Sequence, residues 1–319
     1  MSPPTHGPVV TIGVHIADIL ARPIEYIPEG QDTVLVEQIR LTAAGSAAGT
    51  AVDLVKLGAQ VSTYGAIGDD ELGDFLLAVL GRHGVDVSGL ARRPGEQTAA
   101  SILPIRPDGG RPSFHVPGAN LGVAFADVDA AAVERARAVH LGGMDVTFGL
   151  NDPDFFALLD RARAAGTVVT MDLLSNMPDL LVAAKAFLPH VDHVLPNLEQ
   201  ALAMTGAQDA EEAARRLLAE GPAGALITLG GDGSLVATAD GVTRLPALPV
   251  PVADTTGCGD AYCAGFIVGI LHGNDVVTAA RWGTAAAAKV ATGLGSDAGI
   301  TDLDSTLALL EETAAQGRG

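Results

Sequence analysis

Apolar stretches with extended and helical patterns alternate along the chain, most regularly between residues 127 and 229. Nearly continuous apolar runs predict buried strands, and the amphipathic stretches between them predict helices. The expected strands are 138–141, 168–171, 191–195 and 225–229, and the expected helices are 127–137, 154–165, 178–186 and 209–220. Such alternation predicts βαβ crossovers, and therefore an α/β fold with a doubly wound, mainly parallel sheet covered on both faces.

An apolar run at residues 8–15 predicts a first buried strand, and Asp18 follows just past its end. Ligands of open α/β sheets bind beyond the carboxyl ends of the strands, so this position suits a ligand contact. A helix cap or a loop position explains Asp18 equally well.

Three other stretches have strand composition but do not alternate with helices. They are 33–41, 98–105 and 111–116, and a turn at 107–110 joins the last two. In a chain that is otherwise βα, such strands predict a small separate sheet. Ordinary surface hairpins are the alternative.

Residues 254–260 read Asp-Thr-Thr-Gly-Cys-Gly-Asp and lead into an apolar run of helical length. Gly257 and Gly259 flank Cys258 and allow the backbone to approach a ligand closely. The free N–H groups of a first helical turn, with the positive end of the helix dipole, form an anion site. Asp260 lies where a base would take a proton from a hydroxyl that attacks a phosphate. A capped, glycine-rich turn is the structural alternative.

Composition restricts the partners. The chain of 319 residues has 19 Lys and Arg against 38 Asp and Glu, a net charge of −19. This charge argues against nucleic acid and anionic membranes as partners. The apolar runs are too short to span a bilayer. The first residues lack the pattern of a signal peptide. The two cysteines fit a reduced, cytoplasmic setting. The eight histidines form no spaced metal cluster.

The 254–260 stretch resembles the Asp-Thr-x-Gly-Ala-Gly-Asp signature of the ribokinase-like (PfkB) carbohydrate kinases, with Cys258 in place of Ala. The resemblance covers nearly the whole chain. It implies a single kinase domain, 1–319, with a small β lid inserted from about 33–41 and 97–118. In this family the lid covers the sugar and often pairs with the lid of a second subunit, which implies a possible homodimer.

The resemblance implies ATP-dependent phosphorylation of a hydroxyl on a small sugar, sugar acid or related polyol, with Mg²⁺. Asp260 would be the base. The backbone N–H groups of Gly257, Cys258 and Gly259 would stabilise the charge that develops on the γ-phosphoryl group.

The resemblance also implies substrate contacts. Asp18 corresponds to the acidic residue that holds sugar hydroxyls, and Asn120 is a further candidate. Residues 43–49 weakly resemble the family's Gly-Gly-x-x-x-Asn stretch: Gly45 is retained, but the substrate-binding Asn falls on Gly49. The loss of this Asn argues against ribose or fructose. It could make room for a bulkier substrate, so a nucleoside kinase of the same fold is an alternative.

Other similarities concern the nucleotide and its metal ions. Asn197 begins a segment similar to the family's Asn-x-x-Glu element, which positions Mg²⁺; Gln200 occupies the Glu position, and Glu199 precedes it. The family's Thr-Leu-Gly-x-x-Gly stretch lies under the nucleotide, and a later helix covers the adenine. The corresponding residues are Thr228, Gly230, Gly233 and, on that helix, Thr284. Asp254 and Thr256 belong to a segment that binds a monovalent cation, such as K⁺, in related kinases.

Two other classes of protein are alternatives. A non-catalytic sugar or nucleotide sensor is suggested by Gly49 and Gln200, but a sensor does not need a base such as Asp260. A Rossmann-type oxidoreductase shares only the βα alternation, because no Gly-x-Gly-x-x-Gly follows the first strand. No Gly-x-x-x-x-Gly-Lys P-loop is present either.

Overall fold

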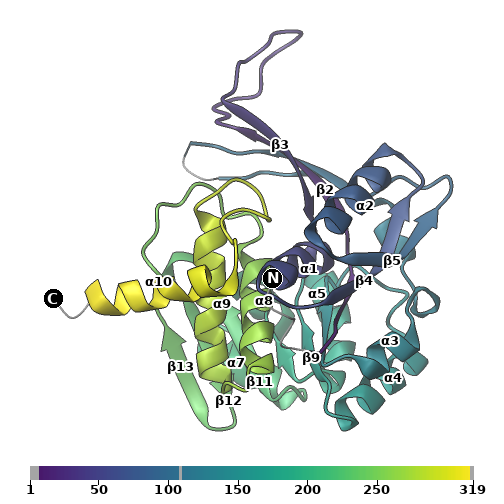
Figure 1. Ribbon diagram of the computed structural model, residues 1–319, viewed down its shortest axis with the longest axis vertical. Helices are drawn as coiled ribbons and strands as arrows, with labels where there is room; N and C mark the ends of the chain where they lie inside the picture. Colours follow the sequence, from purple (N-terminus) through teal and green to yellow (C-terminus); the bar gives the residue numbers. More distant parts are fainter. Residues whose placement is uncertain (1–6, 108–109, 317–319) are drawn as a thin grey trace.

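The computed structural model describes residues 7–107 and 110–316, and within them the strands form two sheets (Figure 1). The main, nine-stranded sheet has the order β13-β12-β11-β10-β9-β8-β1-β4-β5. Its strands are β1 (Val9–Gly13), β4 (Val61–Gly68), β5 (Asp86–Arg93), β8 (Ala138–Gly142), β9 (Val168–Met171), β10 (His193–Val194), β11 (Gly224–Thr228), β12 (Ser234–Thr238) and β13 (Gly241–Leu245). The strands from β11 to β5 are parallel, and β12 and the edge strand β13 are added antiparallel.

Helices cover both faces of the main sheet, as predicted. One face carries α1 (Ser46–Lys56), α2 (Glu71–His83), α8 (Cys258–Leu271) and α9 (Val276–Ala291), and α10 (Leu303–Gln316) packs against α9. The other carries α3 (Ala130–Arg135), α4 (Pro153–Ala164), α5 (Pro178–Ala183), α6 (Leu198–Thr205) and α7 (Ala210–Ala219). Neighbouring residues of β1 enter opposite cores, Val9 on the first face and Val10 on the second. A strand buried on both sides must be apolar throughout, which explains the uninterrupted apolar runs.

The elements predicted between residues 127 and 229 all occur in the expected order, but several are shorter. The helix expected at 127–137 is reduced to α3, because 125–127 form a separate 3₁₀ turn. The helix expected at 178–186 changes after α5 into a 3₁₀ helix, Ala184–His190, which contains Pro189. Proline lacks the N–H that a continued α-helix needs.

The second sheet has the order β3-β2-β6-β7 and projects from the top of the molecule in Figure 1. Its strands are β2 (Ile16–Arg22), β3 (Gln38–Ala44), β6 (Ala100–Pro104) and β7 (Phe114–Val116). The predicted lid segments supply three of the four strands, although β3 begins only at Gln38. The turn expected at 107–110 includes residues 108–109, which lie outside the described part.

The structure corrects the position of Asp18, which lies within strand β2 of the small sheet and not in a loop. The chain turns between Gly13 and Ile16, so one apolar stretch forms two strands in different sheets. Gly13 has a φ of 139°, and a Cβ there would lie 1.9 Å from the Gly142 carbonyl oxygen. Only glycine fits at this turn.

Among the helices that the structure describes, none combines the length and the apolar character that crossing a bilayer requires.

Candidate active site

A cavity of about 870 Å³ lies where the inner face of the small sheet meets the carboxyl ends of the main-sheet strands. Asp18 and Ser101 line it from the small sheet. Asp172 follows β9, and Thr228 ends β11. The first turn of α8 closes the floor. This is the expected location of a ligand in an open α/β sheet, and the volume suits a small-molecule site.

The start of α8 provides free backbone donors. Gly257 has a φ of 79°, and a Cβ there would lie 2.4 Å from Ser296 Cα, so the turn requires glycine. Within the described residues, the N–H groups of Gly257, Gly259 and Asp260 have no acceptor. A Cβ built on Gly259 would meet nothing within 4 Å, so a ligand can approach this backbone. These features fit the phosphates of a nucleotide.

Cys258 differs from its two neighbours in the predicted anion hole. Its N–H donates to the Thr255 carbonyl oxygen at 3.3 Å, so this donor is partly used within the turn. Burial raises the pKa of its thiol to about 12, which leaves no nucleophilic thiolate near neutral pH.

Asp260 lies in the first turn of α8, beside the free N–H groups, and lines the cavity. Burial, together with the charge of Asp18, raises the pKa of its carboxyl to about 7, and Arg111 opposes the shift. A carboxyl that titrates near neutral pH is well suited to accept a proton in a reaction at that pH.

Gly49 lies inside helix α1, and it does not line the cavity. A Cβ at this position would lie 2.4 Å from Asp260 Oδ2 and 3.0 Å from its Cγ. The Asp260 carboxyl therefore occupies the space that a side chain at 49 would fill. The structure does not support the prediction that Gly49 makes room for a bulkier substrate.

Asp18 presents an unsatisfied carboxylate oxygen on the cavity side of the small sheet. The residue is 6% exposed, and its Oδ1 has no hydrogen-bond partner within the described residues. Burial raises the pKa of Asp18 to about 6, although Ser101 and Arg111 lower it. An unpaired buried acceptor favours a ligand that brings a hydroxyl donor.

The other two predicted substrate contacts, Gly45 and Asn120, line the cavity and have structural roles in its wall. Gly45 lines it as the N-cap of α1, with a φ of 91°, and a Cβ there would lie 2.7 Å from the Val14 carbonyl oxygen. Asn120 also lines it, but its Oδ1 accepts from the His15 N–H and its Nδ2 donates to the His15 carbonyl, both at 3.1 Å. Its amide thus holds the turn between β1 and β2.

The predicted nucleotide contacts divide into two groups. Asn197, Thr228 and Gly230 line the cavity. Gly233 does not: it has a φ of 93°, and a Cβ there would lie 2.0 Å from the Leu245 carbonyl oxygen, so it serves the β11–β12 turn. Thr284 also lies outside the lining, and its hydroxyl donates to the Ala280 carbonyl within α9.

The side chains expected to position Mg²⁺ are engaged elsewhere. Gln200 Oε1 accepts from the Asn197 N–H at 3.0 Å, and its Nε2 donates to the carbonyls of Leu173 and Ser175. Glu199 is exposed, accepts from Asn176 Nδ2 at 2.9 Å and does not line the cavity. Both positions therefore stabilise the start of α6 and the loop after β9.

Asp254 braces the anion loop. Its Oδ1 accepts from the N–H and the hydroxyl of Thr256, and its Oδ2 accepts from the Gly295 N–H at 2.9 Å. These bonds give Asp254 a structural role in the loop, and the monovalent-cation site stays a prediction.

Sequence reasoning missed Arg111 and the group of Asp172, His140 and Cys263. Arg111 follows the turn of the lid and is the one Arg or Lys among the described residues that line the cavity. Nothing local distinguishes it from an ordinary surface arginine. His140 and Cys263 are far apart in the chain and meet only in the folded protein.

Comparison with known proteins agrees with this geometry. Residues 9–303 match the model of the pfkB family carbohydrate kinases. The 5-dehydro-2-deoxygluconokinase of Clostridium perfringens is 30% identical over 260 residues, which are 77% of this chain and 77% of that protein. A nucleoside kinase of Methanothermobacter thermautotrophicus is 26% identical over 283 residues, 88% of each chain. The structure of Arabidopsis thaliana ribokinase complexed with ribose and ATP has a TM-score of 0.80 at 25% identity and covers 96% of this chain and 99% of that one. This chain therefore belongs to the pfkB family of carbohydrate kinases.

Proposed function

We propose that the protein transfers the γ-phosphoryl group of ATP to a hydroxyl of a small sugar acid or sugar, with Asp260 as the general base. The observation that carries this proposal is the meeting, in one cavity, of the Asp260 carboxyl, the free N–H groups of α8 and the unpaired oxygen of Asp18. The experiment that tests it is an ATP-consumption assay across sugars, sugar acids and nucleosides.

In this mechanism Asp18 accepts a hydrogen bond from the substrate and orients it. The acceptor hydroxyl attacks the γ-phosphorus, its proton passes to Asp260, and the bond to the oxygen of ADP breaks. The N–H groups of Gly257 and Gly259 stabilise the charge on the transferred group, and the lid keeps water out. Bound Mg²⁺ would neutralise phosphate charge; because Gln200 and Glu199 are engaged, we expect phosphate oxygens and water to be its main ligands.

Arg111 favours an acidic acceptor. Its charge acts on both Asp18 and Asp260, and among the described residues it is the one Arg or Lys of the lining. In a protein of net charge −19, a single arginine facing the substrate region is suited to hold a carboxylate in two parallel hydrogen bonds. The name of the Clostridium relative, a kinase of a gluconic-acid derivative, agrees with this class.

The Arg111→Gln variant should raise KM for the acidic acceptor about 10- to 100-fold, because a hydrogen bond to a charged group is lost. KM for ATP should change little. Arg106→Gln is the matched control, since Arg106 is an exposed lid arginine outside the cavity lining. Steady-state kinetics with an aldonic acid and its uncharged alditol would measure the difference. An equal loss for both substrates would contradict a carboxylate contact.

The two alternatives have less support. The prediction of a nucleoside kinase depended on free space at Gly49, and the Asp260 carboxyl fills that space. A non-catalytic sensor would not need a base of raised pKa beside an anion site. Phosphorylation of a nucleoside but of no sugar acid in the panel would favour the first alternative, and binding without ATP consumption would favour the second.

We further propose that the outer face of the lid forms a homodimer interface. In the strand register, Ile19 pairs with Leu41 on one side and with Ile102 on the other, and Ile102 pairs with Phe114. These side chains therefore lie on one face, and Ile39, two residues from Leu41 on the same strand, shares it. Ile39 is 69% exposed, Ile102 53% and Phe114 62%. A contiguous exposed apolar sheet face of this kind indicates an interaction surface.

The double variant Ile102→Glu/Phe114→Glu should be monomeric where the wild type is dimeric, because two carboxylates would have to be buried against apolar side chains. Light scattering coupled to gel filtration would measure the mass. Val242→Glu, at an exposed apolar position of the edge strand β13, is the control and should leave the mass unchanged. A wild-type monomer at all concentrations would refute the interface.

A further inference from the structure

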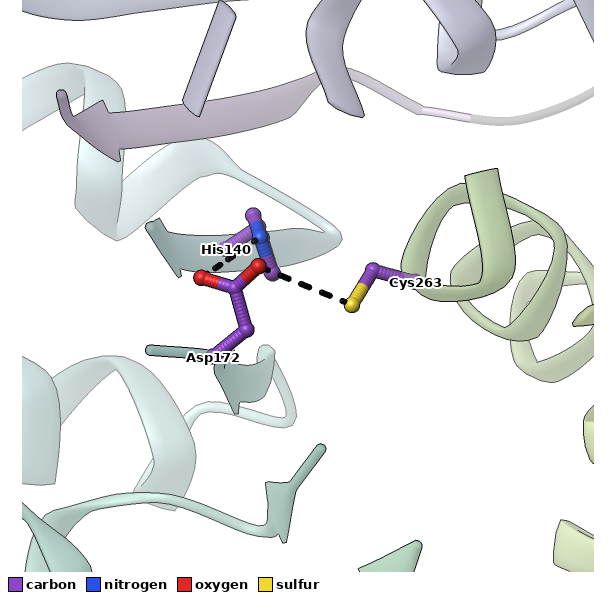
Figure 2. A group of neighbouring side chains, drawn as sticks. All are labelled: His140, Asp172 and Cys263. Carbon is purple, nitrogen blue, oxygen red and sulfur yellow. Dashed lines mark hydrogen bonds and ion pairs between the residues drawn. The ribbon is translucent and has the colours of Figure 1, made fainter. Parts of the chain in front are cut away.

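Three buried side chains of different chemistry lie close together (Figure 2), and one of them, Asp172, also lines the cavity. His140 is on β8, Asp172 directly follows β9, and Cys263 is on α8. Their nearest donor atoms all lie within 4.8 Å of one another. His140 Nε2 is 3.8 Å from Asp172 Oδ1, and Cys263 Sγ is 3.9 Å from Asp172 Oδ2.

The imidazole of His140 is held with one nitrogen unpaired. Its Nδ1 lies 2.9 Å from the Thr170 hydroxyl oxygen, which fixes the ring. Its Nε2 is fully buried and makes no hydrogen bond of good geometry within the described residues, although the ring also interacts with the Ser46 backbone and Nε2 lies 3.8 Å from Asp172 Oδ1. Leaving such an atom unpaired is unfavourable. A metal-binding histidine typically has this arrangement, one nitrogen hydrogen-bonded and the other directed at the ion.

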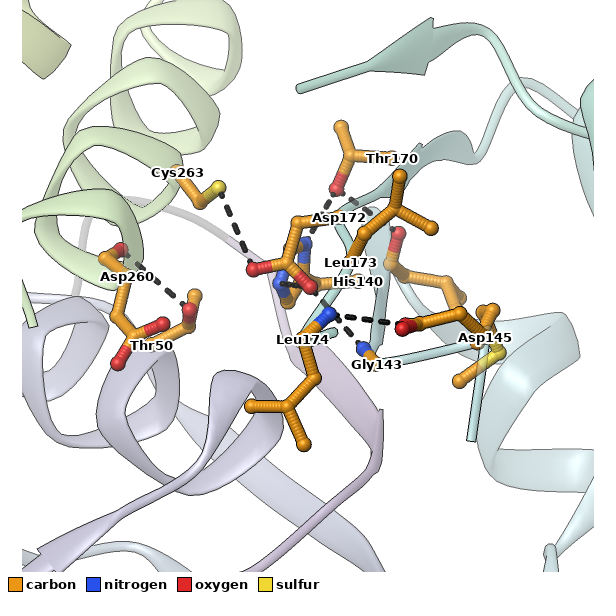
Figure 3. A network of polar contacts seen from close by, with 12 residues as sticks. Thr50, His140, Gly143, Asp145, Thr170, Asp172, Leu173, Leu174, Asp260 and Cys263 are labelled. Atoms are coloured by element: carbon orange, nitrogen blue, oxygen red, sulfur yellow. Dashed lines mark hydrogen bonds and ion pairs between the residues drawn. The ribbon is translucent and has the colours of Figure 1, made fainter. Parts of the chain in front are cut away.

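The surroundings of Asp172 favour a cation. The charged side chains that act on it are Asp260 and Asp145, and both are acidic. Asp172 Oδ1 accepts from the Gly143 N–H at 3.1 Å, so the carboxyl is fixed in position (Figure 3). Because Asp172 also lines the cavity, an ion has a path to it from solvent.

The spacing of the donors is close to that of a bound ion. Bonds of about 2.0–2.3 Å in a tetrahedral zinc site separate the ligand atoms by about 3.5 Å. The two short distances run to different oxygens of Asp172, whereas single ligand atoms of the three residues lie within 4.8 Å of one another. Binding of one ion therefore requires the widest pair to close by up to about 1.3 Å. Rotation of the Cys263 side chain toward the fixed Asp172 carboxyl can supply such a change.

We propose that His140, Asp172 and Cys263 bind one thiophilic divalent cation of the Zn²⁺ class, with its fourth coordination position open to the cavity. The sulfur and imidazole donors select Zn²⁺ or Co²⁺ over Mg²⁺, so this site is distinct from that of the Mg²⁺ that accompanies ATP. It does not depend on the proposed kinase mechanism. The competing explanation is a metal-free polar cluster that only joins β8, β9 and α8.

The test is a titration of the full-length, reduced and chelator-treated protein with Co²⁺. We expect a thiolate-to-cobalt charge-transfer band and tetrahedral d–d bands that saturate at one equivalent, and displacement of Co²⁺ by Zn²⁺. Zn²⁺ should also raise the unfolding temperature, whereas Mg²⁺ alone should not. Absence of the charge-transfer band in the wild type would overturn the proposal.

Variants assign the ligands. Cys263→Ala should abolish the charge-transfer band and weaken Zn²⁺ binding at least about 100-fold, since loss of outer partners alone can cost that much. Cys258→Ala should keep the band, because Cys258 is not part of the cluster. His140→Gln should keep a weakened band and provides a second variant if Cys263→Ala is unstable by circular dichroism. A band that survives Cys263→Ala, or is lost in Cys258→Ala, would refute the site.

Discussion

The Asp260→Asn variant is expected to lower kcat by about 10²- to 10⁴-fold, because an amide cannot accept the proton of the attacking hydroxyl. ATP binding should persist, since the free N–H groups of Gly257 and Gly259 belong to the backbone. Steady-state kinetics and calorimetric titration with ATP measure the two quantities separately. Asp275→Asn is the matched control: this exposed residue caps α9, and asparagine caps a helix equally well.

The pH dependence provides a second readout of the same variant. The pKa of Asp260 is raised to about 7, so the carboxyl is increasingly protonated, and inactive as a base, below that pH. For the wild type, kcat/KM should therefore rise as the pH increases through about 7 and then level off. This rise should be absent from the residual activity of Asp260→Asn. Turnover of the variant near the wild-type value would remove Asp260 as the base.

The Gly49→Ala variant is expected to lower kcat by about 100-fold, which is the scale of a 1 Å displacement of a reacting group. The added Cβ would lie 2.4 Å from Asp260 Oδ2, so the carboxyl must move. KM for ATP should change little, because position 49 does not line the cavity. A loss of kcat in this variant would therefore come from displacement of the Asp260 carboxyl and not from weaker ATP binding.

Gly81→Ala is the matched control for this variant. Gly81 is also inside a helix, α2, and a Cβ there would meet nothing within 4 Å. Alanine at such a position should stabilise the protein by about 0.5–1 kcal/mol and leave kcat unchanged. If Gly49→Ala behaves in the same way as Gly81→Ala, the contact between Gly49 and Asp260 has no part in catalysis.

The fold was predictable because burial on both faces imposes a pattern on each strand. β8 and β9 appear where apolar runs predict them, and α8 begins at the glycine-flanked turn. The small sheet was only partly predictable: β2 continues the apolar sequence of β1, and the turn between them depends on close contact of Gly13 with Gly142. No local sequence pattern indicates that Gly13 contacts Gly142, because the two residues are far apart in the chain.

The candidate site was predictable where the backbone itself forms it. The glycines at 257 and 259 and the acid at 260 predict an anion site with a base, and the structure brings these residues together at the start of α8. Side chains of Asn120 and Gln200 were harder to interpret, because their amides bond to loops that only the tertiary structure brings near. The sequence showed that Gly49 lacks a side chain but not that the Asp260 carboxyl fills its place.

The most direct test of the account is a crystal structure with a non-hydrolysable ATP analogue, Mg²⁺ and an aldonic acid. We predict that a substrate hydroxyl lies about 2.6–3.2 Å from an Asp260 carboxylate oxygen and in line with the γ-phosphorus, with phosphate oxygens on the N–H groups of Gly257 and Gly259. A substrate bound with no hydroxyl within reach of Asp260, or a γ-phosphate away from the start of α8, would contradict it.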